Sequence, residues 1–398
     1  MNCVAVHEAV IDAGLSFEAP TYVYDLGELH ARCARLERAL PAAARVFFAT
    51  MANDHPVLLG ELRERGHGVF VNSPRHLELA LATGFEPSQV LYAATNMLAR
   101  EMRATLASGA RLVIDSIGQL RTLAEVAPPS TRVELRVDVG SALDGGQLAH
   151  EPGYRFGVLP SELSMAARIA TASGVTIGGV HAYFGTDVMS VDVLLDGLER
   201  LCGVLRALPA ATTVDVAGGL GVGDGLSDFD LEGYGLGAAA ILERWSSRLD
   251  RALELVIEPG RWLAATCGHL FVTVVDVKRR ATRTFVGTNG SVAIFPRPLM
   301  YPDRARHPCG IVGEHDRPEH VQPIWVCGNS TYSRDFLAAG IRMALPRPGE
   351  RLVIGNAGAY SRSMITEFLG KPRPAEICLP SDGAGAGEPD ALRDAARR

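Results

Sequence analysis

Lysine is almost absent from this chain. Among its 398 residues the only lysines are Lys278 and Lys371, so arginine carries nearly all of the positive charge. The formal net charge is -6, and no run of basic residues interrupts the sequence. A nucleic-acid-binding protein carries a basic patch or stripe, because neutralisation of phosphates supplies much of its affinity. The composition therefore predicts no nucleic-acid partner.

Cysteine pairs and long apolar runs are also missing. The seven cysteines are scattered without a C-x-x-C pair, which predicts reduced thiols and neither a disulfide framework nor a zinc site. The apolar stretches are strand-sized and interrupted by charges, too short to span a bilayer. The first residues, MNCVAVHEAVIDAG, lack the basic start and the continuous apolar core of a secretion signal. We expect a cytoplasmic protein without membrane association or bound metal.

Strand-like and helical segments alternate over most of the chain. Eight short β-branched or apolar runs are separated by stretches rich in Ala, Leu, Arg and Glu with helical spacing. Eight strand–helix units in succession are typical of a (β/α)8 barrel, whereas an open doubly wound sheet seldom reaches that number. The predicted strands are Arg45–Ala49, Gly68–Asn72, Val90–Ala93, Arg111–Asp115, Arg132–Asp138, Thr176–Tyr183, Thr213–Ala217 and Glu254–Glu258.

The pattern changes after Arg261. From about Leu270 the chain consists of strand-like runs joined by Gly, Pro and Asn turns, which predicts an all-β domain. Residues Thr21–Tyr24 are expected to add a strand to it. The predicted fold is thus α/β, a TIM-type barrel followed by a C-terminal all-β domain. Its expected divisions are a segment 1–25 that joins the β domain, the barrel at 26–265, the β domain at 266–380 and a flexible Gly/Ala-rich tail at 381–398.

Two glycine-containing turns follow the last two predicted barrel strands. The active site of such a barrel lies at the carboxyl ends of its strands, and the loops after strands seven and eight form its usual phosphate site. Strand seven runs into 215–221, DVAGGLG, and strand eight ends in Glu258–Arg261, EPGR. Glycines let backbone N–H groups approach an anion, and a helix starting behind them adds a favourable dipole. We expect a phosphate-bearing ligand here; the alternative is two tight turns with a surface arginine.

Motifs along nearly the whole chain resemble those of fold type III decarboxylases that use pyridoxal 5'-phosphate (PLP), the group of ornithine, diaminopimelate and arginine decarboxylases. The EPGR segment is similar to the family motif whose glutamate pairs with the pyridine nitrogen, and 217–221 is similar to its phosphate loop, with Ala217 replacing the first glycine. The resemblance implies a homodimer with a shared active site. It also implies a PLP site containing Gly218, Gly219, Gly221, Glu258, Gly260, Arg261 and the phosphate-contacting Tyr360.

The departures from the family pattern fall at catalytic positions. Met51, in the segment FATMAN, stands where the family has the lysine that forms an imine with PLP, and a thioether cannot do so. Phe70 and His76 stand where acidic residues are usual. Thr331 replaces the cysteine that donates a proton from the partner subunit, whereas Asp335, which resembles a contact to the substrate amine, is retained. The resemblance thus implies catalytic positions at Thr331 and Asp335, in a site weakened by the loss of the lysine and the cysteine.

The sixth predicted strand ends in HAYFGT, similar to the family segment H-x-H-x-G-S. Tyr183 replaces the ring-stacking histidine and Thr186 the serine; an aromatic face can still stack, and a hydroxyl can still bind phosphate. This version resembles a branch that decarboxylates aminoacyl groups carried on acyl-carrier proteins in antibiotic pathways. The resemblance implies an acyl-carrier protein as a partner and a role in secondary metabolism.

Three functions remain open from the sequence. The chain can be a lyase of amino-acid or carrier-tethered aminoacyl decarboxylase ancestry that binds PLP without a covalent link. It can be a catalytically inactive family member that acts as a dimer partner or binds another protein. It can also use the phosphate pocket for chemistry that needs no imine. The retained phosphate motifs favour the first and third functions. The missing lysine and cysteine favour the second, since losing acid–base help alone costs about 10²–10⁴-fold in rate.

Overall fold

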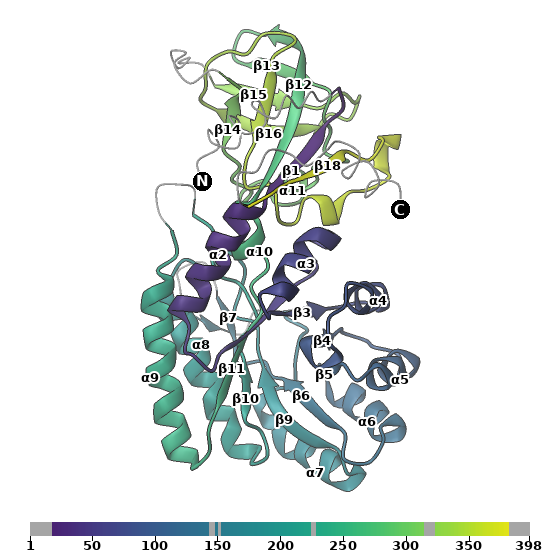
Figure 1. Ribbon diagram of the computed structural model, residues 1–398, viewed down its shortest axis with the longest axis vertical. Helices are drawn as coiled ribbons and strands as arrows, with labels where there is room; N and C mark the ends of the chain where they lie inside the picture. Colours follow the sequence, from purple (N-terminus) through teal and green to yellow (C-terminus); the bar gives the residue numbers. More distant parts are fainter. Residues whose placement is uncertain (1–17, 143–147, 150–152, 224–227, 314–322, 382–398) are drawn as a thin grey trace. The chain divides into compact units, whose positions relative to one another are not determined.

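The computed structural model describes residues 18–142, 148–149, 153–223, 228–313 and 323–381. The chain divides into two compact units, one of Ala34–Trp262 and one of Met1–Cys33 with Leu263–Arg398 (Figure 1). The expected barrel limits were residues 26 and 265, whereas the observed unit begins at 34 and ends at 262. Helix α2 (Leu26–Ala39) crosses the first of these observed boundaries, and helix α10 (Arg261–Ala264) crosses the second. The tail expected at 381–398 lies outside the described residues except for its first residue.

The unit of residues 34–262 contains a closed barrel of eight parallel strands, which confirms the predicted fold class. Several strands end earlier than predicted, because the residues that close them leave the ladder. The N–H of Asp115 donates to the side chain of Gln119, and the N–H of Ala217 donates to the side chain of Asp215. The strands are β2 (Arg45–Ala49), β3 (Gly68–Val71), β4 (Val90–Ala93), β5 (Arg111–Ile114), β6 (Arg132–Arg136), β9 (Thr176–His181), β10 (Thr213–Asp215) and β11 (Glu254–Ile257).

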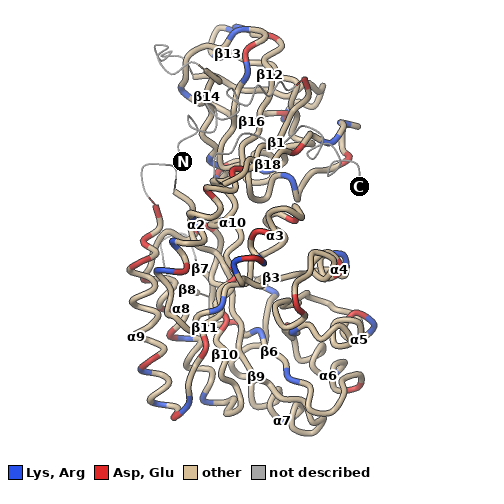
Figure 2. Tube along the Cα trace, viewed as in Figure 1, with Lys and Arg blue, Asp and Glu red and all other residues tan. Residues whose placement is uncertain are grey.

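Helices connect the strands on the outside of the barrel (Figure 1). Several begin at residues suited to capping: the Ser73 side chain accepts from the N–H of His76, and a proline occupies the first turn behind it. Figure 2 shows both signs of charge interspersed along α9. None of the described helices combines the length and apolar character of a membrane span. The helices of this unit are α3 (Pro56–Glu64), α4 (Pro74–Ala82), α5 (Ala99–Ser108), α6 (Ile117–Val126), α7 (Leu163–Ser173), α8 (Val191–Val204) and α9 (Leu231–Leu249). It also contains 3-10 turns at Pro87–Gln89, Pro160–Glu162 and Leu205–Ala207. Two short strands, β7 (Ser141–Ala142) and β8 (Leu148–Ala149), pair antiparallel.

The barrel interior has an apolar side and a polar side. Strands β2 to β5, with Val256 of β11, contribute a buried apolar cluster. The strands β6, β9 and β10 and the end of β11 contribute the buried groups Glu134, His181, Asp215 and Glu258. Buried charges are rare unless they have partners, so the polar side is where chemistry is expected. The apolar cluster comprises Phe47, Ala49, Phe70, Leu91, Ala93, Val113 and Val256, with Met51 packed against it.

The other unit contains an eight-stranded sheet in the order β14-β17-β12-β13-β15-β16, extended by β1 and β18. The strand expected at 21–24 is β1 (Thr21–Asp25), which pairs antiparallel with β12 (Gly268–Arg279) and parallel with β18 (Ala375–Leu379). Sequence patterns did not predict β18, the three-residue β14 (Cys309–Ile311) or β16 (Phe336–Ile341), whose FLAAGI is poor in β-branched residues. The remaining elements are β13 (Thr284–Thr288), β15 (Ile324–Cys327), β17 (Arg351–Ile354), α11 (Arg297–Met300) and 3-10 turns Arg362–Met364 and Phe368–Gly370.

Candidate active site

The loops that follow β9, β10 and β11 are joined by backbone hydrogen bonds. The Val188 N–H donates to the Gly219 carbonyl at 2.8 Å, and the Gly221 N–H donates to the Val188 carbonyl at 3.0 Å. These bonds form an isolated parallel bridge between Val188 and Leu220. The two predicted glycine turns and the end of strand six therefore come together at the carboxyl end of the barrel, as the sequence led us to expect.

The glycines of these turns are required by close backbone approach. A Cβ atom on Gly218 would lie 2.4 Å from the Glu258 carbonyl oxygen, and one on Gly219 would lie 2.1 Å from the Gly185 carbonyl oxygen. Gly219 also has a φ of +92°, a left-handed conformation that favours glycine. On Gly260 a Cβ would lie 2.8 Å from the Ala52 Cβ. Backbone N–H groups are consequently brought to the surface of the site without side chains over them.

Ala217 stands where the resemblance expects a glycine. Its φ is +51°, in the left-handed region that glycine adopts freely. For a residue with a Cβ this conformation costs about 1–2 kcal/mol. Two hydrogen bonds hold it: its N–H donates to the Asp215 Oδ1 at 2.8 Å, and its carbonyl accepts from the Glu258 N–H at 2.6 Å.

Among the described residues, the next helix after Gly221 is α9, which begins at Leu231. Behind the other turn, α10 begins at Arg261 and has four residues, too few for a large macrodipole. The N–H groups of Gly218 and Gly219 have no acceptor among the described residues, and they can bind an anion directly.

Arg261 is buried at the edge of the same turns, with 7% of its surface exposed. Its Nε lies 3.1 Å from both carboxylate oxygens of Asp187, and its Nη1 is buried without a hydrogen-bond partner in the described part of the protein. Sequence reasoning missed Asp187, although it directly follows Thr186 in the strand-six motif. The phosphate end of the site thus has a buried guanidinium edge that lacks an anion.

The opposite end of the polar side holds two carboxyl groups and an imidazole, all buried. Atoms of His181, Asp215 and Glu258 that can bind a ligand lie within 4.8 Å of one another, and the His181 Nε2 is 3.5 Å from the Glu258 Oε1. Burial raises the pKa of Glu258 to about 8, and burial together with Glu258 holds the pKa of Asp215 well above its ordinary value. Burial lowers the pKa of His181. This set can share a proton, bind a cation or meet a ring nitrogen.

Two of these three residues were not predicted as functional. Asp215 closes strand seven immediately before the glycine turn, which was the available signal. His181 lies inside the sixth predicted strand; it is buried, and neither ring nitrogen has a hydrogen-bond partner among the described residues. The Oε1 of Glu258 is also buried without one. Because buried polar atoms are nearly always paired, these atoms are suited to a bound polar group.

Tyr183 and Thr186 lie between the two ends. The Tyr183 hydroxyl and the Thr186 Oγ1 are 2.6 Å apart, and burial raises the pKa of Tyr183. The phenol therefore stays protonated and can donate to the threonine. That arrangement leaves the threonine hydroxyl proton for a further acceptor, and it fixes the orientation of the aromatic ring.

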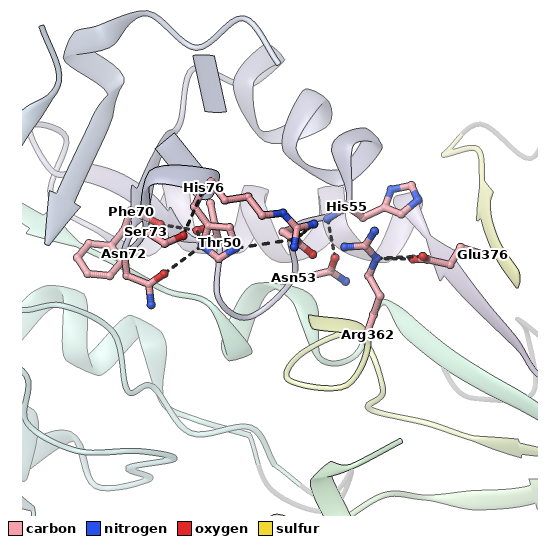
Figure 3. Close-up of polar contacts among 11 residues, drawn as sticks. Thr50, Asn53, His55, Phe70, Asn72, Ser73, His76, Arg362 and Glu376 are labelled. Carbon is pink, nitrogen blue, oxygen red and sulfur yellow. Dashed lines mark hydrogen bonds and ion pairs between the residues drawn. The ribbon is translucent and has the colours of Figure 1, made fainter. Parts of the chain in front are cut away.

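Met51 and its neighbours form a different environment at the ends of β2 and β3. Met51 packs against the apolar cluster that contains Phe70. The Nδ1 of His76 is 3.1 Å from the Thr50 Oγ1 and 3.0 Å from the Asn72 Oδ1 (Figure 3). The Thr50 hydroxyl also donates to the Phe70 carbonyl at 2.9 Å. The positions 51, 70 and 76, which depart from the family pattern, are therefore built into packing and hydrogen bonds. The His76 Nε2 also lies 3.8 Å from a carboxylate oxygen of the buried Asp54.

The remaining predicted residues belong to the β unit. Asp335 is 4% exposed, and its oxygens accept from the N–H groups of Val292 at 2.7 Å and Ser330 at 3.2 Å, and from the hydroxyls of Ser291 and Ser330. Asp335 thereby organises the 328–335 loop. Thr331 is exposed on that loop, and Tyr360 adopts a φ of +53°.

Comparisons with known proteins agree with this geometry. Residues 26–265 match the family model described as pyridoxal-dependent decarboxylase, pyridoxal binding domain. The diaminopimelate decarboxylase of Methanothermobacter thermautotrophicus is 29% identical over 91% of this chain and 87% of its own length. That of Deinococcus radiodurans is also 29% identical, over 93% and 92%.

Solved structures show the same fold at lower identity. Diaminopimelate decarboxylase from Helicobacter pylori complexed with L-lysine superposes with a TM-score of 0.83 at 21% identity, covering 97% of this chain and 98% of that one. Lysine/ornithine decarboxylase from Vibrio vulnificus complexed with cadaverine gives 0.80 at 19% identity, covering 94% and 98%. Because the family model covers residues 26–265, more than half of the chain, the protein belongs to the pyridoxal-dependent decarboxylases.

Proposed function

We propose that this protein binds PLP without a covalent link and decarboxylates an amino-acid substrate slowly. The observation that carries the proposal is the set of buried orphaned atoms on the polar side: the Glu258 Oε1 and the Arg261 Nη1 have no hydrogen-bond partner in the described part of the chain. One is a partner for a ring nitrogen and the other for a phosphate oxygen. These groups fit the two ends of a phosphorylated pyridine.

Residues at the carboxyl ends of β9, β10 and β11 would hold this ligand. The N–H groups of Gly218 and Gly219 and the guanidinium of Arg261 would bind the phosphate, Glu258 would pair with the pyridine nitrogen, and the ring of Tyr183 would stack on the pyridine. Gly221 and Gly260 allow the backbones to approach, Thr186 adds a hydroxyl, and the role of Tyr360 in the β unit stays a prediction from the resemblance. When bound, PLP would supply an aldehyde that condenses with the substrate amine and a ring that withdraws the electrons left by the departing carboxyl group.

Met51 determines that this binding is non-covalent. It offers no amine, so retention of the ligand depends on the phosphate and ring contacts alone. Phe70 gives the methionine an apolar neighbour in place of an acid. Thr331, whose hydroxyl is a far weaker acid than a thiol, is proposed as a poor proton donor and Asp335 as the support of its loop. A slow reaction follows from both substitutions.

The substrate class is taken from the relatives. They are named diaminopimelate decarboxylases, so a free amino acid is the first candidate. An aminoacyl group on a carrier protein in secondary metabolism is the second, because Tyr183 and Thr186 resemble that branch. A homodimer is the proposed assembly.

A second function, that of an inactive family member which binds a protein partner, is favoured by one observation. Met51 packs against the apolar cluster that includes Phe70, and His76 contacts Thr50 and Asn72, so the ends of β2 and β3 offer no amine for covalent attachment. The buried polar atoms of Glu258 and Arg261 argue against this second function. Burying a polar atom without a hydrogen-bond partner costs stability, so such atoms are expected where a ligand pairs with them. Chemistry that needs no imine is a further alternative on the same pocket.

The test is equilibrium dialysis of the purified protein against PLP, followed by the absorbance spectrum of the bound fraction. We expect saturable binding, an aldehyde-like spectrum and no product trapped by borohydride on the protein. Carbon dioxide release is then measured with free and carrier-bound amino acids. Absence of binding at millimolar PLP would exclude the proposal and leave the partner-binding function. Binding without any carbon dioxide release would support ligand binding and exclude decarboxylation.

A further inference from the structure

Asp187 joins the three loops of the phosphate end. It lies in the loop after β9, its Oδ1 accepts from the N–H of Val222 in the loop after β10 at 2.9 Å, and both of its oxygens accept from the Nε of Arg261 after β11 at 3.1 Å. Its neighbour Val188 forms the backbone bridge to Leu220. One carboxylate thus contacts both of the turns that are expected to hold the phosphate.

The conformation of Asp187 suits this junction. Its φ is +58°, in the left-handed region where aspartate is tolerated better than most residues other than glycine. In that conformation the side chain reaches the two neighbouring loops, and 22% of it is exposed. A strained backbone held by several contacts is typical of positions whose side chain must be placed accurately.

The contact also determines which edge of the Arg261 guanidinium is used. The Nε of Arg261 donates to Asp187, whereas the Nη1 is buried and has no hydrogen-bond partner among the described residues. Guanidinium groups bind anions through a planar fork of N–H donors, and a donor held in place loses less freedom when an anion arrives. A carboxylate on the Nε side orients the arginine and leaves the other edge for the ligand.

We propose that Asp187 is a positioning residue for phosphate: it holds Arg261 and the 217–222 turn in the arrangement that binds the phosphate group. This rests on the proposed function, since it presupposes a phosphorylated ligand. Asp187 also carries a negative charge beside the anion, which opposes binding. The geometry indicates that orientation outweighs this repulsion, because the carboxylate charge is already compensated by the guanidinium it contacts.

The test compares PLP with pyridoxal, which lacks the phosphate. The dissociation constant of pyridoxal divided by that of PLP measures the contribution of the phosphate group alone. A variant that weakens the binding of both ligands equally leaves this ratio unchanged. We expect Asp187→Ala to reduce this ratio about tenfold or more, the effect of losing a charge-assisted contact. Asp187→Asn, which keeps an acceptor oxygen, should retain most of it. Asp196→Ala, which removes the exposed ion pair to Arg200 on α8, is the matched control and should leave the ratio unchanged.

A double-mutant cycle shows whether Asp187 acts through Arg261. Adding Asp187→Ala to Arg261→Ala should change the ratio little further, because the group being positioned is gone. Additive effects would overturn the proposal. So would a wild-type ratio in Asp187→Ala, or tighter PLP binding by Asp187→Asn, which would show that repulsion dominates. Failure of the wild-type protein to bind PLP excludes both this and the proposed function, whereas a wild-type ratio in the alanine variant excludes only the role of Asp187. Circular dichroism checks that each variant is folded.

Discussion

The two sides of the barrel site differ in how they meet a cofactor. The side formed by the loops after β9, β10 and β11 keeps glycines in close contact, a buried arginine and orphaned carboxyl and imidazole atoms. The side formed by the ends of β2 and β3 is closed by Met51, Phe70 and the hydrogen bonds of His76. The comparison shows that the groups suited to an anion and the position that the resemblance assigns to the covalent amine lie at different strand ends of the barrel.

The physical reason is where each property is located. In the proposed site, phosphate binding is shared between backbone N–H groups and the Arg261 guanidinium, so the loss of one side chain would weaken it without abolishing it. Covalent attachment depends on one amine, and a single substitution abolishes it. Once the amine is gone, an acidic neighbour would be an uncompensated charge against the apolar cluster. The presence of Phe70 and His76, where acidic residues are usual, agrees with this cost.

Restoring the amine should produce the largest change. In Met51→Lys the new amine lies next to Phe70, where partial burial lowers its pKa and keeps it nucleophilic. We expect a covalent link to PLP that borohydride traps, and decarboxylation faster by about 10²-fold or more. Mass spectrometry and carbon dioxide release measure the two effects. Met51→Leu is the control and should show neither. If Met51→Lys binds PLP but forms no link, the two sides of the site do not face one ligand.

Disturbing the phosphate side should have the next largest effect. Gly219→Ala places a Cβ against the Gly185 carbonyl in a left-handed conformation, so we expect PLP affinity to fall about a hundredfold, or about 2.7 kcal/mol. Gly66→Ala is the matched control: its φ is +83°, but nothing lies within 4 Å of an added Cβ. It should cost about 1 kcal/mol of stability and leave PLP binding unchanged. Equal loss of binding in both variants would show that the close contact has no role.

The buried carboxyl of Glu258 should make stability depend on pH. Its pKa is raised from 4.5 to about 8, so between these values the unfolded chain is ionised while the folded protein keeps the proton. Stability is therefore lost as pH rises from about 5 to 8, by up to about 1.4 kcal/mol per pH unit. In Glu258→Gln this contribution disappears, so urea unfolding at several pH values should show a smaller loss of stability with rising pH. The slope that remains comes from Asp215, whose pKa burial also raises. Glu254→Gln, at the half-exposed opposite end of β11, should keep the wild-type slope.

The smallest effect is expected at His76. Its alanine variant loses the contacts to Thr50 and Asn72, and each net hydrogen bond contributes about 1 kcal/mol. Urea midpoints should fall accordingly, while the affinity for PLP stays the same. A double-mutant cycle with Thr50→Val should show coupling of about 0.5 kcal/mol or more. Weaker PLP binding in His76→Ala would mean that the side formed by the ends of β2 and β3 does contact the cofactor.

Much of the fold was predictable because it depends on local patterns. Apolar runs at strand–helix spacing predicted all eight barrel strands, and the turns DVAGGLG and EPGR lay where the phosphate loops were expected. The strands β14, β16 and β18 were not predicted, since short or weakly β-forming segments become strands through pairing with neighbours.

The site was predicted where motifs are contiguous and missed where they are not. Glu258 and Arg261 stand together in one motif, so both were found. Asp187 and Asp215 were missed because their partners are distant in sequence: Arg261 is 74 residues from Asp187.

The sequence by itself determined that the chain forms a barrel, resembles pyridoxal-dependent decarboxylases and carries methionine where the resemblance places the lysine. These follow from periodicity, motif spacing and the identity of one residue. Only the tertiary structure decided that Met51 packs against the apolar cluster of the barrel, that His181, Asp215 and Glu258 converge, and that Asp187 contacts Arg261. Closure of the barrel brings β11 beside β2 and places distant strand ends around one axis, and no local pattern encodes those contacts.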